Sequence, residues 1–148
     1  MNRNRLISLF LFFLGMAAVL FPVSTVQAQS KRQVERIKQE LSGRVVQMTY
    51  RVGEVVYGTY YIDTVTFCRS GQYASESQSR KQTVLDNVQP GSSRDAGQWT
   101  VIYSQGQYFI QFSSRYGSVN YLPVALYRNG SISMGNGVSA RFLGRARC

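Results

Sequence analysis

The spacing of hydrophobic and polar residues changes twice along the chain. An uncharged stretch rich in Leu and Phe runs from Leu6 to Phe21. A helical pattern follows from Ser30 to Ser42, where Val34, Ile37 and Leu41 recur on one stripe. Beyond this segment the period becomes two and β-branched and aromatic residues dominate, which predicts strands for the rest of the chain.

The uncharged stretch has the features of a secretory signal. Arg3 and Arg5 precede it, and the small residues Val26 and Ala28 follow it at the positions that signal peptidase recognises. We predict cleavage after Ala28 and export of the protein to the periplasm or the cell exterior. The alternative is an uncleaved membrane anchor, because the uncharged residues from Leu6 to Ser30 are enough to span about 30 Å of hydrocarbon.

Short strands separated by turn residues make up the second part of the chain. They are expected at residues 44–51, 54–62, 64–68, 72–77, 99–104, 107–113 and 118–127, with a further short strand at 83–88. Asn129-Gly130 and Asn136-Gly137 are typical of hairpin turns, since these residues adopt positive φ readily. The polar segment from Glu76 to Gly97 predicts a long loop.

These strands predict one all-β domain. Strands joined by local hairpins favour a small antiparallel up-and-down barrel of about eight strands, with a compact sandwich as the alternative. The predicted organisation is a signal peptide at 1–28, a short helix and linker at 29–43 and the β-barrel domain at 44–148. We expect the helix, whose polar face carries mixed charges, to pack on the barrel as a lid or plug rather than to lie on a membrane.

Two cysteines, Cys68 and Cys148, lie far apart in the sequence. An even number of cysteines in an exported protein predicts a disulfide. By the chain-entropy argument the cross-link would stabilise the fold by about 4 kcal/mol. Alternation along the last strand places Cys148 with the apolar residues, which favours pairing over two free thiols or a bond to a partner chain.

Positive charge is the main feature of the composition. Loss of Arg3 and Arg5 with the signal lowers the net charge from +10 to +8. The best candidate anion-binding cluster is on one face of the last strand, and one further arginine at the start of the first strand is expected nearby. The cluster consists of Arg141, Arg145, Arg147 and Arg44. Arginine favours planar contacts with carboxylates and phosphates.

This charge predicts a partner that is an acidic envelope polymer or protein. No nucleic acid is expected as a partner, and membrane contact is expected only through an uncleaved signal segment. The alternative is a solvated charge row that keeps the protein soluble and protects a sheet edge.

Catalysis is not predicted. The chain has no histidine, which removes the usual general base and the commonest zinc ligand, and its cysteines lack C-x-x-C spacing. We therefore predict no catalytic residues, no cofactor and no metal. The weakest hypothesis is an enzyme that uses a pair of carboxylates, and turn-capping or solvated acids are its alternative. The acids considered are Glu54, Asp63, Glu76, Asp86 and Asp95.

Aromatic residues on nearly every strand suggest a last candidate site, a ligand cavity inside the barrel. An eight-stranded barrel can be wide enough to hold one small ligand. The predicted cavity residues are Trp99, Tyr61 and Tyr108, and the corresponding function is a lipocalin-like carrier of a small apolar ligand. The alternative is a barrel whose aromatics simply fill the core.

Several short motifs occur in a characteristic order. They are Leu41-Ser-Gly-Arg44, Gly58-Thr-Tyr-Tyr61, Val65-Thr-Phe-Cys-Arg-Ser-Gly-Gln-Tyr73, Gly97-Gln-Trp99 and Asn136-Gly137. This order resembles an uncharacterised, lipocalin-like small β-barrel module of bacterial exported proteins. The chain departs from the pattern by ending in Cys148 and by lacking a basic or aromatic residue directly after Asn136-Gly137. The resemblance implies a barrel fold and implies no activity, since the family has none assigned.

Overall fold

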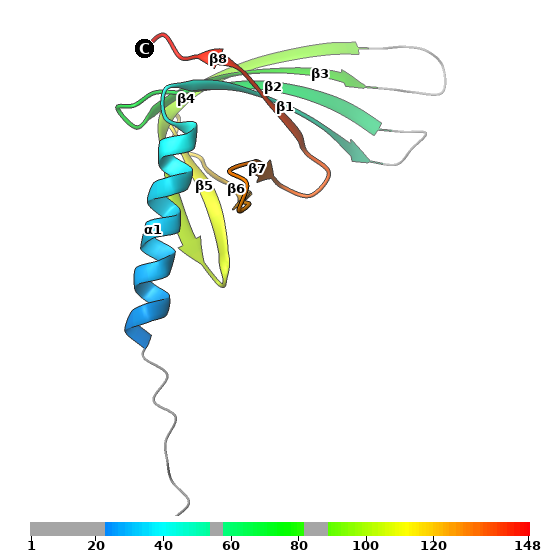
Figure 1. The fold of residues 1–148 in the computed structure, drawn as a ribbon. Coiled ribbons are helices and arrows are strands. Elements are labelled where there is room, and N and C mark those ends of the chain that lie inside the picture. The colour runs from blue at the N-terminus through cyan, green and yellow to red at the C-terminus, as the bar shows by residue number, and fades with distance from the viewer. Residues whose placement is uncertain (1–22, 54–57, 82–88) are drawn as a thin grey trace, which may run out of the picture.

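The computed structural model of the chain describes residues 23–53, 58–81 and 89–148. In these residues a helix, α1 (Val23–Leu41), precedes eight strands. The strands are β1 (Arg44–Gly53), β2 (Gly58–Phe67), β3 (Gln72–Lys81), β4 (Gln89–Ser104), β5 (Gln107–Ser114), β6 (Val119–Leu126), β7 (Ile132–Met134) and β8 (Ser139–Arg145). All pairs are antiparallel, in the order β7-β6-β5-β4-β3-β2-β1-β8. The predicted up-and-down barrel is confirmed, and it is nearly closed, with β7 and β8 at the two ends of the sheet (Figure 1).

Two of the predicted strands are one. The described residues of the expected strand at 54–62 and the expected strand at 64–68 form the single strand β2, because Asp63 stays in the ladder with β1 instead of making a turn. The predicted short strand at 83–88 lies outside the described residues.

The prediction of a long loop from 76 to 97 is wrong for the described residues. There β3 and β4 pair continuously, from Gln72 with Gln98 to Lys81 with Gln89. The hairpin was missed because its residues are polar on both faces, so they show no hydrophobic alternation. Backbone hydrogen bonds hold the strands together where the side chains contribute little burial.

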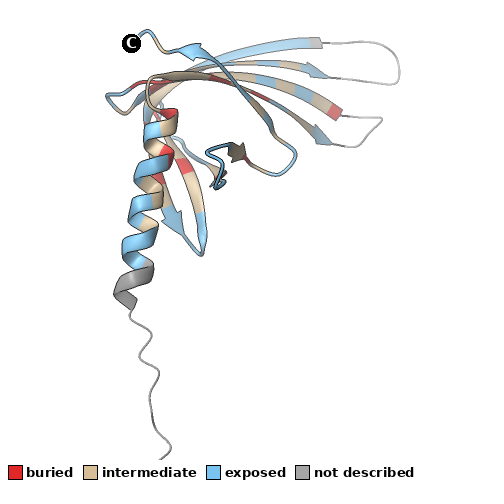
Figure 2. Ribbon diagram, in the orientation of Figure 1, coloured by how far each residue is buried: buried red, intermediate tan, exposed pale blue. Residues whose placement is uncertain are grey.

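The helix covers one end of the barrel. It starts at Val23, earlier than the predicted start at Ser30, and continues to Leu41. Ile37 and Leu41, on the apolar stripe in the C-terminal half of α1, are fully buried. Buried residues gather where this half of the helix meets the strands (Figure 2). Gly43, at φ +74°, then turns the chain directly into the sheet.

The hydrophobic core fills the end of the barrel next to α1. Its buried members are Ile37, Leu41, Val46, Met48, Val65, Phe67, Tyr73, Trp99, Val101, Ile110, Val124 and Met134. Phe67 has no exposed surface and packs edge-on against Trp99, with ring centroids 4.9 Å apart. The other end of the barrel, further along the same strands, is less completely filled.

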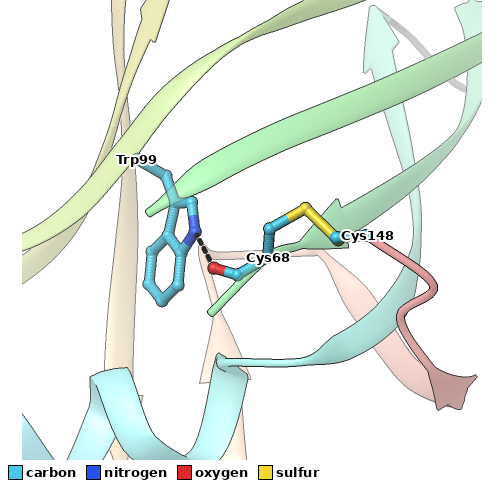
Figure 3. Close-up of a disulfide and its surroundings, with 3 residues drawn as sticks. All are labelled: Cys68, Trp99 and Cys148. Atoms are coloured by element: carbon cyan, nitrogen blue, oxygen red, sulfur yellow. Dashed lines mark hydrogen bonds between the residues drawn. A yellow bond between two sulfur atoms is a disulfide. The ribbon is translucent and has the colours of Figure 1, made fainter. Parts of the chain in front are cut away.

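The predicted disulfide is confirmed. Cys68 and Cys148 are bonded, with their Cα atoms 5.8 Å apart. Beside it, the indole Nε1 of Trp99 donates a hydrogen bond of 3.2 Å to the backbone oxygen of Cys68 (Figure 3). The bond ties the segment after β8 to the turn between β2 and β3, and it indicates an oxidising compartment outside the cytoplasm.

The predicted signal peptide lies mostly outside the described residues, so its cleavage after Ala28 stays a prediction. Among the helices of the described part, none has the length and apolar character that a membrane crossing requires.

A glycine shapes the bend where β4 passes from one partner to the next. β4 pairs with β3 up to Gln98 and with β5 from Gly97 onward. A Cβ atom on Gly97 would overlap the backbone oxygen of Ser113, so a side chain does not fit here. This close approach gives a physical reason for the glycine in the Gly97-Gln-Trp99 motif.

Candidate functional site

A cavity of about 410 Å³ lies inside the barrel, beyond the core as seen from α1. Its apolar lining residues are Met48, Val65, Phe112, Leu122 and Val138. Its polar lining includes Tyr50, Asp63, Tyr73, Asp95 and Asn120. The volume is in the range of pockets that bind small molecules. Such pockets also combine apolar walls with a few polar groups, as this one does.

Both carboxylate oxygens of Asp95 accept hydrogen bonds from neighbouring residues. Its Oδ1 accepts hydrogen bonds from Ser114 Oγ (2.6 Å) and the Ala96 amide (2.8 Å), and its Oδ2 accepts one from Tyr73 Oη (2.6 Å). Burial acts to raise the pKa of Asp95, but the hydrogen bonds from Ser114, Tyr73 and Ala96, together with the charge of Arg115, outweigh it and hold the pKa below its usual value. Asp95 is therefore ionised at neutral pH.

Asp63 has fewer partners. Tyr50 Oη donates a hydrogen bond of 2.8 Å to its Oδ2, and the Tyr50 ring is stacked on Tyr61 with centroids 5.1 Å apart. Burial, then the hydrogen bond and charge of Asp63, raise the pKa of Tyr50 above its usual value, so its hydroxyl stays a donor. Among the described residues Asp63 Oδ1 is buried and accepts no hydrogen bond. Because a carboxylate can accept about four hydrogen bonds, Asp63 keeps unused acceptor capacity.

The pair of Tyr73 and Asp95 makes stability depend on pH. Burial, then the hydrogen bond and charge of Asp95, raise the pKa of Tyr73 to about 12. The folded state thus favours protonated Tyr73, and this stabilisation is complete below about pH 10 and lost as the pH rises through 12. Asp95 behaves in the opposite sense: its stabilisation is present above about pH 4 and is lost as the pH falls.

The free energy of unfolding, measured by urea denaturation, should therefore be constant around neutral pH and should fall at both acid and alkaline pH. We expect Tyr73→Phe to lower the value around neutral pH and to make the alkaline decline shallower, since one of the tyrosines that must stay protonated is gone. The decline that remains is assigned to Tyr50 and Tyr108, whose pKa values are also raised by burial. An alkaline limb as steep in Tyr73→Phe as in the native protein would contradict this assignment.

The structure separates the three predicted cavity residues. Trp99 is a core residue beneath the cavity and is not part of its lining. Tyr61 stacks on the lining residue Tyr50, and Tyr108 lines a different cleft, beside α1. Aromatic content therefore predicted the residue type, but it gave no way to tell core positions from cavity positions.

Two of the five carboxylates considered for an acid pair, Asp63 and Asp95, line the same cavity. Glu76 is on the outer face of β3, 3.8 Å from Arg94, while Glu54 and Asp86 lie outside the described residues. The signal for Asp63 was present in the sequence, because it is two residues before Val65 and so shares its inward face. What the sequence lacked was the register that brings Asp95 to the same place.

The predicted arginine cluster on one face of the last strand is not formed. Arg141 pairs with Gln47, whereas Arg145 pairs with Arg44, and Leu143 is an extra residue between these pairs. This β-bulge reverses the alternation, so that Arg141 and Arg145 are on opposite faces of the sheet. Arg147 follows the end of β8.

Two of the four candidate arginines, Arg141 and Arg44, also have local partners. Arg141 Nε donates a hydrogen bond of 2.9 Å to Gln47 Oε1. Arg44 is 3.2 Å from Glu40 Oε2, and its guanidinium lies over the ring of Phe142. The bulge also weakens the alternation argument for Cys148, although the disulfide it supported is present.

No protein-family model, curated protein or solved structure matches this chain. The resemblance to a bacterial exported barrel module therefore agrees with the fold and stays a prediction in every other respect. In the described part of the chain, no group of three or more His, Cys, Asp or Glu side chains could hold a metal ion.

Proposed function

We propose that this chain is a non-enzymatic binding protein of a compartment outside the cytoplasm, which holds one small molecule inside its barrel. The ligand has an apolar body and a cationic or hydrogen-bond-donating head. The observation that carries the proposal is the cavity of about 410 Å³ with Asp63 and Asp95 in its wall.

The apolar lining supports burial of the ligand's body. Met48, Val65, Phe112 and Leu122 come from four different strands, Val138 directly precedes β8, and all five line one space. Each square ångström of apolar ligand surface removed from water contributes roughly 25 cal/mol. This part of the proposal agrees with the predicted carrier of a small apolar ligand, and the polar lining adds a head group to that ligand.

The two carboxylates favour a positively charged head. Asp95 is ionised and already accepts three hydrogen bonds, whereas Asp63 has acceptor capacity left. An ammonium group near Asp63 would gain charge-assisted hydrogen bonds, each with a net contribution of about 1.5–3 kcal/mol. The interior would thus select a cationic head group, although the chain as a whole carries a net charge of +10.

The same geometry argues for binding rather than hydrolysis. A glycosidase needs one carboxyl group with a raised pKa, so that it can protonate the leaving group. The pKa of Asp95 is lowered, and both Asp63 and Asp95 are held by tyrosine hydroxyls. These contacts suit fixed acceptors better than groups that exchange protons during a reaction.

Calorimetric titration with octylammonium and octanoate tests the proposal, because these probes share a chain and differ in the charge of the head. We expect octylammonium to bind at least roughly tenfold more tightly than octanoate. Asp63→Asn should weaken octylammonium binding by about tenfold. The matched control is Glu76→Gln, which removes one negative charge from the outer face of β3 and should change nothing.

A second variant tests the position of the site. Leu122→Trp adds bulk to the cavity wall and should abolish binding of both probes, with folding checked by circular dichroism. Equal affinities for the native protein, Asp63→Asn and Leu122→Trp would contradict the proposal.

A further inference from the structure

A second cleft, of about 430 Å³, lies between α1 and the barrel. One wall is the middle of α1, including Gln33 and Arg36. The facing wall comes from β4, β5 and the segment after β6, and includes Tyr103, Tyr108, Tyr127 and Arg128. We infer that this cleft binds a small oxyanion, a carboxylate or phosphate group carried on a sugar-sized body.

The charges of the cleft carry this inference. Arg36 and Arg128 come from segments far apart in the sequence, and the lining of the cleft contains no carboxylate. Within the described residues neither arginine forms an ion pair, whereas Arg44 and Lys38 pair with Glu40 and Glu35. Two guanidinium groups in one cleft repel each other, and an anion between them turns that repulsion into attraction.

The chemistry of the donors fits an oxyanion. Arginine presents a planar fork of N–H groups that matches carboxylate and phosphate oxygens. Tyr103 and Tyr108, with ring centroids 4.8 Å apart, add hydroxyl donors and flat surfaces on which a ring-shaped body can rest. Burial, then the proximity of Tyr103, raise the pKa of Tyr108, so its hydroxyl keeps its proton.

The walls of the cleft are connected to each other. Gln33 Nε2 donates a hydrogen bond of 3.4 Å to the backbone oxygen of Leu126, which joins α1 to the end of β6. Further along α1, Ile37 and Leu41 are buried in the core, so the helix is fixed relative to the barrel. The two arginines are therefore presented by a framework that exists before the ligand arrives.

This site is independent of the barrel cavity. The two share no lining residue, and their charges are opposite, with carboxylates in the cavity and guanidinium groups in the cleft. Anion binding was predicted from the sequence at the last strand, and the structure gathers suitable side chains at α1 instead.

Titration by NMR with glucuronate, glucose 1-phosphate and neutral glucose tests the inference. We expect saturable, salt-sensitive shifts with at least one of the two anions and none with glucose. Binding of glucuronate alone identifies a carboxylate site, and binding of glucose 1-phosphate alone identifies a phosphate site. Each of Arg36→Gln and Arg128→Gln should weaken binding by roughly tenfold.

Two controls separate this site from other positive charges and from the barrel cavity. Arg32→Gln removes an exposed arginine from the same helix outside the cleft lining, and Asp63→Asn alters only the cavity; neither should change the affinity for the anions. The inference is overturned if neither anion binds saturably, if glucose binds equally well, or if the double variant Arg36→Gln/Arg128→Gln binds as the native protein does.

Discussion

Replacement of both cysteines, by Cys68→Ser with Cys148→Ser, is expected to lower the free energy of unfolding by about 4 kcal/mol. The bond closes a loop with a sequence separation of 80 residues, which contains all strands after β2. Without it the unfolded chain gains the conformations that the loop forbids, and the folded state loses its anchor for the C-terminal segment. A loss of this size is a large fraction of the stability of a small domain.

Urea unfolding of the native protein, with and without reductant, measures this effect against the double serine variant. The reduced native protein and the variant should unfold at the same, lower urea concentration. The hydrogen bond from Trp99 to Cys68 uses the backbone oxygen, so it survives the substitution and does not confuse the comparison. A midpoint that shifts by less than the uncertainty of the measurement would contradict the assigned role of the cross-link.

The second large loss of stability is expected from Phe67→Ala, at about 3–5 kcal/mol. Phe67 is fully buried and contacts both Trp99 and Phe112, with ring centroids at 4.9 and 5.9 Å. Removal of the ring leaves a cavity where β2, β4 and β5 meet, which the rigid strands cannot fill. The smaller change Phe67→Leu should cost less, because it keeps most of the apolar volume.

Ile62→Ala is the matched control, since Ile62 is on the same strand with its side chain 37% exposed on the outer face. Chemical denaturation of the three variants should place Phe67→Ala far below the native protein and Ile62→Ala close to it. Similar losses for Phe67→Ala and Ile62→Ala would mean that the two faces of β2 are wrongly assigned.

Much of the fold was predictable because it depends on local patterns. Period-two alternation identifies strands such as β1 and β5, and the glycines that take positive φ, Gly106 and Gly130 among them, mark the turns between strands. The disulfide followed from the number of cysteines and the predicted compartment. These signals require no knowledge of which strand lies beside which.

The fold predictions failed where the hydrophobic and polar pattern does not reveal how the strands pair. Polar residues on both faces hid the pairing of β3 with the start of β4. A single extra residue, Leu143, reversed the alternation of β8 and divided the expected arginine cluster. A shift of one residue moves every later side chain to the other face, and the sequence of the strand does not record it.

The candidate sites were partly predictable for the same reason. Asp63 and Asp95 were recognisable as carboxylates, but only the register of four neighbouring strands places them around one space. Arg36 and Arg128 meet through the packing of α1 on the barrel, a long-range contact with no local signal.

A crystal structure of the protein grown with octylammonium would test ligand binding inside the barrel. We expect electron density for one alkyl chain inside the barrel between Phe112 and Leu122, with the ammonium nitrogen within hydrogen-bonding distance of Asp63. A barrel interior closed by its own side chains, or an octylammonium bound only at the outer surface, would contradict the proposal.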